Sequence, residues 1–163
     1  MSRIKLALAV LLAATVVLTA APANAEEVVI HDPKGDASSY DIDSVTVKHR
    51  EERVRFHFHA DRTPYGYHAF IDVPGGRNWE YVVTWAVYTP SRLSVLTPKQ
   101  FRKGGGAVCR LKTGKETTIR DVEYAVPTRC FGDPAKLRVK AKGWDDEAGY
   151  TDTTAWSKWA NRG

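Results

Sequence analysis

Residues 53–61 alternate strictly between apolar and polar side chains, and this pattern constrains the fold more than any other in the chain. The apolar members are Val54, Phe56, Phe58 and Ala60. A period of two places successive side chains on opposite faces of a β-strand. The segment therefore predicts a strand with one face in a hydrophobic core and the other, which carries His57 and His59, in water.

Similar short segments recur along the chain, separated by turns rich in Pro, Gly and Asp. They cover residues 28–30, 45–48, 67–73, 79–88, 91–96, 107–111, 117–126 and 137–141. We expect 107–111 to pair with 117–126, and 98–106 to form a basic loop. No sustained helical period follows residue 25. The sequence thus predicts an all-β fold, an antiparallel β-sandwich of the jelly-roll or immunoglobulin-like kind with about eight strands.

The first 25 residues carry the features of a secretory signal peptide. Arg3 and Lys5 precede an apolar run over 6–18, and residues 23–25 read Ala-Asn-Ala, the small-x-small pattern of a cleavage site. The run is too short for a membrane-spanning helix, which needs about 20 apolar residues. We therefore expect a secreted, extracellular protein, a single domain over 26–163, and no membrane attachment after cleavage.

The net charge argues against a nucleic-acid ligand. It is +5 for the whole chain, and removal of Arg3 and Lys5 lowers it to +3. A nucleic-acid binder concentrates its positive charge in a stripe, which this sequence lacks. The predicted mature chain is one domain in size and can bury about two-thirds of its surface on folding. We expect it to be a monomer.

The chain has two cysteines, Cys109 and Cys130. In an oxidising compartment an isolated pair forms a disulfide far more often than a redox or metal site. Such a bridge closes a loop of about 20 residues and stabilises the fold by roughly 3 kcal/mol. The alternative, a catalytic thiol, requires one of the two cysteines to stay free beside a base.

Two segments resemble known proteins. Residues 31–36 read His-Asp-Pro-Lys-Gly-Asp and 40–45 read Tyr-Asp-Ile-Asp-Ser-Val, which resembles the start of DOMON and CBM9-like, carbohydrate-binding-like β-sandwiches. Residues 126–132 read Val-Pro-Thr-Arg-Cys-Phe-Gly and, with Cys109 upstream, are similar to a group of short secreted actinobacterial proteins of unassigned function. The resemblance implies a sandwich whose late strands are tied by the disulfide, and no catalytic residue. It also implies carbohydrate as the leading ligand class.

Some DOMON relatives bind haem through a Met or His axial pair. Met1 is the sole methionine of this chain and lies in the predicted signal peptide, so we expect no Met–His haem site.

Closely spaced aspartates suggest a calcium site. The four members of the first cluster are Asp32, Asp36, Asp41 and Asp43. A second acidic cluster consists of Asp145, Asp146 and Asp152. Calcium takes six to eight oxygen ligands, although this spacing is not that of an EF-hand. The first and last strands of a sandwich often lie close together, so the two clusters can meet. We expect either no cofactor or a calcium ion here; without calcium, Asp32 caps a turn and its neighbours are solvated.

Aromatic residues are the candidates for ligand contact. Trp79, Tyr81 and Trp85 alternate and are expected to fill the core. Trp144, Trp156 and Trp159 lie in a polar tail that predicts either a short helical turn or an irregular strap, and these three are the candidate ligand-binding residues. Tryptophan stacks well on the apolar faces of sugars, which makes a carbohydrate or a cell-wall polymer the leading partner.

Two polar groups have weaker implications. His57 and His59 form an H-x-H pair that could hold zinc or copper, but Arg53 and Arg55 on the same face would repel a divalent ion. The basic segment 99–115 contains Lys99, Arg102, Lys103, Arg110, Lys112 and Lys115. It is either a solvated surface or a docking site for anionic partners.

No G-x-S-x-G, H-E-x-x-H or other familiar catalytic pattern occurs. We therefore expect a secreted, non-catalytic β-sandwich that acts as a binding or structural module, with carbohydrate as the leading ligand class. The alternative is an extracellular protein-interaction or inhibitor protein that uses the basic segment 99–115. A small hydrolase is the third hypothesis.

Overall fold

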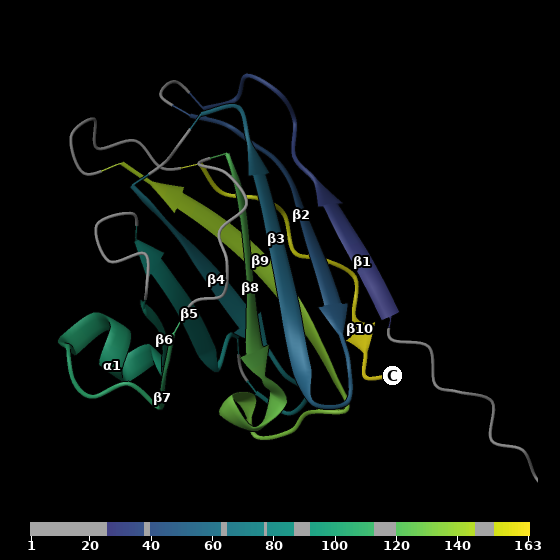
Figure 1. The fold of residues 1–163 in the computed structure, drawn as a ribbon, viewed down its shortest axis with the longest axis vertical. Helices are drawn as coiled ribbons and strands as arrows, with labels where there is room; N and C mark the ends of the chain where they lie inside the picture. The colour runs from purple at the N-terminus through teal and green to yellow at the C-terminus, as the bar shows by residue number, and fades with distance from the viewer. Residues whose placement is uncertain are drawn as a thin grey trace, which may run out of the picture.

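The computed structural model describes residues 26–37, 40–62, 65–76, 78–86, 92–112, 120–145 and 152–163. The predicted signal peptide, residues 1–25, lies outside the described residues. The described residues form two antiparallel sheets that pack face to face (Figure 1). This arrangement confirms the predicted all-β sandwich.

One sheet has four strands and the other has six. The four-stranded sheet runs in the order β1 (Glu26–His31), β2 (Ile42–His49), β3 (Arg53–Ala60) and β8 (Asp121–Pro127). The six-stranded sheet runs in the order β10 (Ala160–Asn161), β9 (Lys136–Trp144), β4 (Gly66–Asp72), β5 (Tyr81–Ala86), β6 (Arg92–Leu96) and β7 (Cys109–Lys112). The sequence analysis missed β10, because two residues carry no detectable period.

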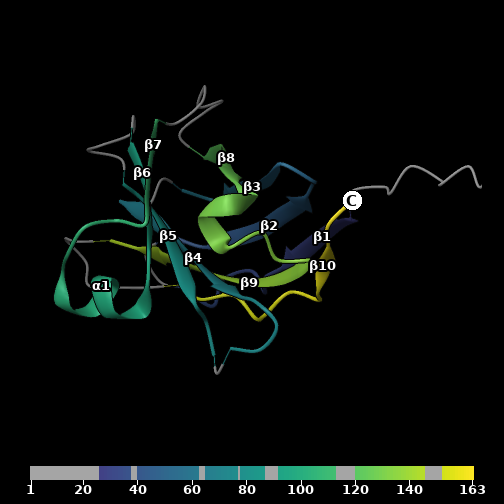
Figure 2. The same ribbon diagram turned by 90° about the horizontal axis from the view of Figure 1, so that it is seen from below.

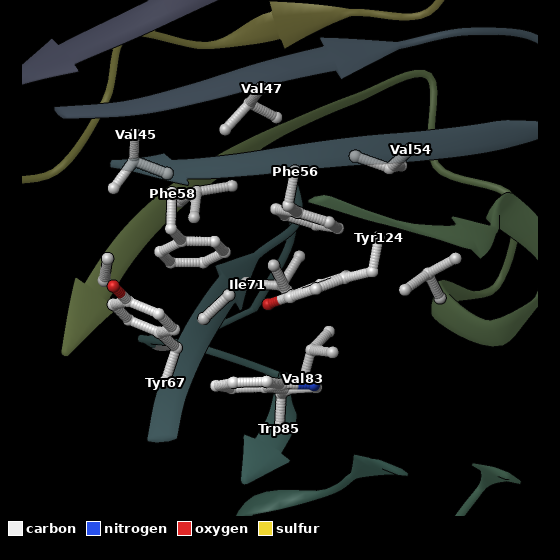
Figure 3. Packing of buried hydrophobic residues seen from close by; sticks show 14 of the residues in the cluster. Val45, Val47, Val54, Phe56, Phe58, Tyr67, Ile71, Val83, Trp85 and Tyr124 are labelled. Carbon is white, nitrogen blue, oxygen red and sulfur yellow. The ribbon is translucent and has the colours of Figure 1, made fainter. Parts of the chain in front are cut away.

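The alternating segment forms β3 as predicted. Its four apolar side chains are fully buried and face the six-stranded sheet. Phe58 stacks on Tyr67 of β4, with ring centroids 4.5 Å apart, and on Tyr124 of β8, with centroids 5.5 Å apart (Figure 3). The Phe58–Tyr67 contact joins the two sheets at the centre of the core, and the Phe58–Tyr124 contact lies within the four-stranded sheet.

The predicted pairing of 107–111 with 117–126 is wrong. Strand β7 pairs with β6, and β8 pairs with β3, so the two segments belong to different sheets. Local sequence order misled the prediction, because the chain crosses from one sheet to the other between residues 112 and 121. Residues 113–119 of that connection lie outside the described residues.

The disulfide joins the two sheets. Cys109 begins β7, and Cys130 lies in a short 3₁₀ helix, η1 (Thr128–Phe131), directly after β8. The two residues are bonded, with Cα atoms 5.9 Å apart. The predicted Cys109–Cys130 bridge is therefore present, and it excludes a free catalytic thiol at either position.

The expected loop over 98–106 begins instead with a helix, α1 (Pro98–Lys103). Thr97 caps it: its hydroxyl accepts the N–H of Gln100, and the Gln100 side chain accepts the N–H of Thr97 at 2.8 Å. The sequence Thr-Pro-Lys-Gln carries the pattern of this reciprocal capping box, with proline at the first helical position, and could have predicted the start of the helix. No helix among the described residues is long and apolar enough to cross a membrane.

Residues 152–159 of the polar tail form an irregular strap beside β9, one of the two predicted alternatives. Backbone N–H groups of Thr154 and Ser157 donate to the carbonyls of Ala141 and Val139 at 3.0 and 2.8 Å. The Ser157 hydroxyl accepts the N–H of Val139 at 2.9 Å. These bonds hold the strap against the free edge of β9 before the chain enters β10.

Candidate functional site

The six-stranded sheet has one face turned away from the four-stranded sheet, which we call the outer face. Along β4 the buried Tyr67, Ala69 and Ile71 point into the core, so His68 and Phe70 point outward. Helix α1 covers part of the outer face (Figure 2). Its Phe101 meets Phe70 and His68 edge-on, with ring centroids 5.9 and 5.1 Å apart.

A row of polar side chains crosses the outer face from strand to strand. Direct cross-strand pairs join Lys142 to His68, His68 to Thr84, Thr84 to Ser94, and Ser94 to Arg110. Residues opposite one another in antiparallel strands share a face of the sheet. We call these five residues the polar row. At about 4.8 Å per strand, the row extends about 19 Å.

A groove of about 740 Å³ follows most of this row. Its floor contains His68, Thr84, Ser94 and Arg110. The neighbouring residues on one side are Leu96 and Phe101, and those on the other are Ala86 and Trp144. Trp85, Leu93 and Leu111, which belong to the core face, complete the lining. The groove thus has polar groups along its floor and apolar groups on both sides.

Trp144 lies across Gly66, its partner on β4. A Cβ atom on Gly66 would come within 2.7 Å of the indole Nε1. The indole also stacks on the His68 imidazole, with ring centroids 5.8 Å apart and planes at 10°. The indole therefore occupies a position that a side chain at residue 66 would block.

His68 is a neutral hydrogen-bonding group at the floor of the groove. Burial, and then the positive charge of Lys142, lower its pKa to about 4. A neutral imidazole offers one donor and one acceptor. Its buried Nδ1 and the buried Nε1 of Trp144 have no hydrogen-bond partner within the described part of the chain. A polar ligand or a water molecule would supply one.

A second hollow of about 340 Å³ lies on the same face. Its lining includes Phe70, Trp79, Lys140, Lys142 and Trp156. Lys142 belongs to the polar row as well, so the second hollow begins where the row ends. Trp79 packs edge-on against Phe70, with ring centroids 4.9 Å apart.

The expectation that Trp79 fills the core is wrong. Residue 79 precedes β5, which begins at Tyr81, so strand alternation does not reach it. Trp85 is in the core as predicted, and Tyr81 packs against the core while half-buried.

The three predicted ligand-binding tryptophans all lie along the outer side of β9. Trp144 borders the groove, and Trp156 lines the second hollow. The ring of Trp159 is covered by Lys136 and by Arg138, whose charged groups lie 5.2 and 5.1 Å from its centroid. Arg138 also lies 5.1 Å from the centroid of the Trp156 ring, whereas Trp144 lines the groove with no cation over its ring among the described residues.

The acidic clusters meet only in part. Carboxylate oxygens of Asp32, Asp36 and Asp152 lie within 4.8 Å of one another, so the second cluster contributes one member. Asp41 lies beside them and accepts the N–H of Gly35. Asp43 instead lies 3.4 Å from Lys34.

Burial first, and then mutual repulsion, disfavours the charged form in this acidic group. Burial and then Asp152 raise the pKa of Asp32 to about 6. Burial also raises the pKa of Asp152, although that carboxylate accepts the N–H of Ile42 at 2.6 Å. A proton or a cation would relieve the repulsion, and oxygen ligands of this kind suit calcium.

The two histidines of β3 lie on the outward face of the four-stranded sheet. Both contact Asp121, His57 at 3.3 Å and His59 at 2.7 Å, and His59 also lies 3.4 Å from Asp43. Arg55 pairs with Glu123 on the same surface at 3.4 Å. These side chains form a network of contacts between basic and acidic residues on an exposed surface.

The basic segment 99–115 divides among several places. Lys99, Arg102 and Lys103 lie on α1 and are exposed, whereas Arg110 ends the polar row. Lys115 lies outside the described residues, as do Asp146 of the second acidic cluster and Tyr88 at the end of a predicted strand. The polar row could not be predicted from the sequence, because its five members come from five strands and only the register aligns them.

No family model, no curated protein and no solved structure matches this chain.

Proposed function

We propose that this chain is a secreted, non-catalytic carbohydrate-binding module that holds a saccharide in the groove on its outer face. One observation carries the proposal: the polar row, about 19 Å long, passes between Trp144 and Phe101, whose rings both lie against His68. A sugar ring has an apolar face of C–H groups and a rim of hydroxyls. It needs an aromatic surface and a line of hydrogen-bonding groups together.

The floor of the groove suits a rim of hydroxyls. The Ser94 hydroxyl can donate and accept, and neutral His68 offers a donor and an acceptor. The Thr84 hydroxyl donates to the Ser94 carbonyl at 3.4 Å and offers its oxygen as an acceptor. Arg110 adds a guanidinium at the far end. Most of these groups are half-buried, so a ligand would meet them partly shielded from water.

The open shape supports a chain-like ligand rather than a single sugar. The polar row crosses five strands, and the second hollow extends it towards Trp156. Trp144 and Trp156 would then contact different sugar units of one chain. Trp159 would contribute less, because it lines neither hollow and two cations lie over its ring, against one over the ring of Trp156.

The lining supports binding rather than hydrolysis. Glycosidases use a pair of carboxyl groups on either side of the bond that they cleave. Neither an Asp nor a Glu is among the described residues that line the groove. The predicted signal peptide and the disulfide, a bond typical of oxidising compartments, favour an extracellular place of action.

The experiment is affinity gel electrophoresis of the mature chain against a panel of soluble polysaccharides, with pull-down on insoluble ones. We expect retardation by at least one polymer, and loss of that retardation in Trp144→Ala. The matched control is Trp159→Ala, which removes an indole from the same face but outside both hollows. Thermal melts show whether each variant is folded.

The proposal fails if no polysaccharide retards the wild-type chain. It also fails if folded Trp144→Ala binds as tightly as the wild type. A second groove variant, Thr84→Val, keeps the shape of the side chain and removes one hydroxyl, so it tests the groove even if Trp144→Ala is unstable.

A further inference from the structure

Three cations of the outer face lack a counter-charge. Within the described ranges, Lys140, Lys142 and Arg110 make no ion pair. Other basic residues, one of them on the outer face itself, do have an acidic partner. Lys48 contacts Glu27 at 2.7 Å, and Arg138 donates to Asp72 at 2.6 Å. The outer face thus concentrates positive charge where the two hollows lie.

These cations follow the path proposed for the ligand. Lys140 and Lys142 are two residues apart on β9, so they share a face about 7 Å from one another. Arg110 lies at the opposite end of the polar row, about 19 Å from Lys142. Charges spaced along a line match a ligand that carries repeated negative groups better than one small anion.

The acids near this face are already engaged. Asp72 is buried and bound by Arg138. The carboxylate of Glu80 accepts the N–H of Val73 at 3.0 Å. No carboxylate is among the described lining residues of either hollow. A neutral saccharide would leave Lys140 and Lys142 without a partner, whereas an acidic one would neutralise them.

We propose that the ligand of this face is an acidic polysaccharide, whose anionic groups meet Lys142, Lys140 and Arg110 while its sugar rings pack on Trp144 and Trp156. This inference rests on the proposed carbohydrate-binding function and adds the charge of the ligand to it. The shared chemistry is a repeated anion on a sugar chain. It is found in carboxylated polymers such as polygalacturonate and alginate, and in phosphate-linked polymers such as teichoic acid.

The test compares polygalacturonate with its methyl ester, which keeps the backbone and removes the charge. Alginate and teichoic acid serve as further carboxylate and phosphate probes. We expect the wild-type chain to prefer the acidic probe and to lose affinity as salt rises. The double variant Lys140→Gln/Lys142→Gln should bind that probe about fivefold to tenfold more weakly. Arg53→Gln, which removes one charge from the opposite side of the sandwich, should bind like the wild type.

Several results would overturn the inference. These are equal affinity for polygalacturonate and its methyl ester, unchanged binding in the double lysine variant, or an equal loss in Arg53→Gln. Tighter binding to single-stranded oligodeoxythymidine than to every acidic polysaccharide would also overturn it, since the anion would then be a nucleic acid. Binding to neutral polymers that depends on Trp144 but not on the lysines would leave the proposed function intact and reject the acidic ligand alone.

Discussion

Gly66 and Trp144 face each other across the β4–β9 pair, and the missing side chain at Gly66 is what leaves room for the Trp144 indole. The indole then reaches the His68 ring, which it covers in a stacked arrangement. One glycine in β4 therefore determines where the main aromatic surface of the groove lies.

We expect Gly66→Ala to disturb both the groove and the fold. The new Cβ atom would lie 2.3 Å from the carbonyl oxygen of Trp85 and 2.7 Å from the Trp144 indole, so backbone or indole must move. Overpacking of this kind costs about 1–3 kcal/mol. Urea unfolding measures the loss, and tryptophan fluorescence reports the displaced indole. Gly106→Ala is the matched control, because a Cβ atom there meets nothing within 4 Å. Equal stability of the two variants would contradict the packing described.

The Cys109–Cys130 bridge should contribute roughly 3 kcal/mol to the free energy of unfolding. Removing both cysteines with Cys109→Ala/Cys130→Ala should therefore lower the melting temperature by several degrees or more. Dithiothreitol should lower the melting temperature of the wild type and leave that of the double variant unchanged. A wild-type melting temperature that does not respond to the reductant would mean that the bridge is not formed.

Truncation of Phe56 tests the orientation of β3. Its side chain is fully buried, and its ring lies 5.3 Å from that of Tyr124. Phe56→Ala should cost about 3–5 kcal/mol of stability, measured by chemical denaturation. Arg53→Ala, on the exposed face of the same strand, should change stability by less than about 0.5 kcal/mol. A small effect of Phe56→Ala would mean that the strand turns its other face to the core.

Acid should destabilise the protein partly through His68. Its pKa is lowered to about 4 by burial and then by Lys142, whereas an unfolded histidine has the value 6.5. The unfolded chain thus gains a proton first, and stability is lost as the pH falls from 6.5 towards 4. Between pH 6.5 and 4, the free energy of unfolding of His68→Gln should fall by on the order of 2 kcal/mol less than that of the wild type.

Urea unfolding at a series of pH values measures the difference between the two proteins. His49, whose pKa is also lowered by burial, remains in both and supplies a common background. Parallel stability curves for the wild type and His68→Gln would contradict the assignment.

For the acidic group of Asp32, Asp36 and Asp152 we expect the opposite dependence of stability on pH, and a response to calcium. The pKa of Asp32 is raised to about 6, mainly by burial and Asp152, from an unfolded value of 3.8. Ionisation of Asp32 is therefore harder in the folded protein than in the unfolded chain. The stability of the fold falls progressively as the pH rises from 3.8 to about 6. At neutral pH with a chelator present, Asp32→Asn should raise stability by about 1 kcal/mol, less than the full pKa shift implies, because solvent screens this partly exposed carboxyl.

Millimolar calcium should stabilise the wild type and not Asp32→Asn, if three carboxylates hold the ion. Asp43→Asn is the control, because Asp43 lies beside Lys34 rather than in this group. A calcium-induced rise in melting temperature that persists in Asp32→Asn, or no rise in the wild type, would reject a calcium site there.

The features that depend on neighbouring residues could be predicted from the sequence. The alternation in β3 was visible because adjacent residues carry it, and the pairing of Cys109 with Cys130 followed from their number. The partners of β7 and β8 were not predictable in this way, since strand pairing depends on contacts between distant segments. The polar row is the extreme case, because Lys142 and Arg110 are aligned only through the register of three intervening strands. The helix α1 could have been predicted, since its capping residues lie close together in the sequence.

Strand β7 has only four residues and pairs with β6 alone among the described strands. A short edge strand with bonds on one side frays readily, and its free backbone groups invite pairing with a second chain. The covalent link from its first residue to the opposite sheet opposes both events. Reduction of the disulfide would therefore loosen the end of the groove beside Arg110 before it loosened the core. The bridge also protects the protein against edge-to-edge aggregation.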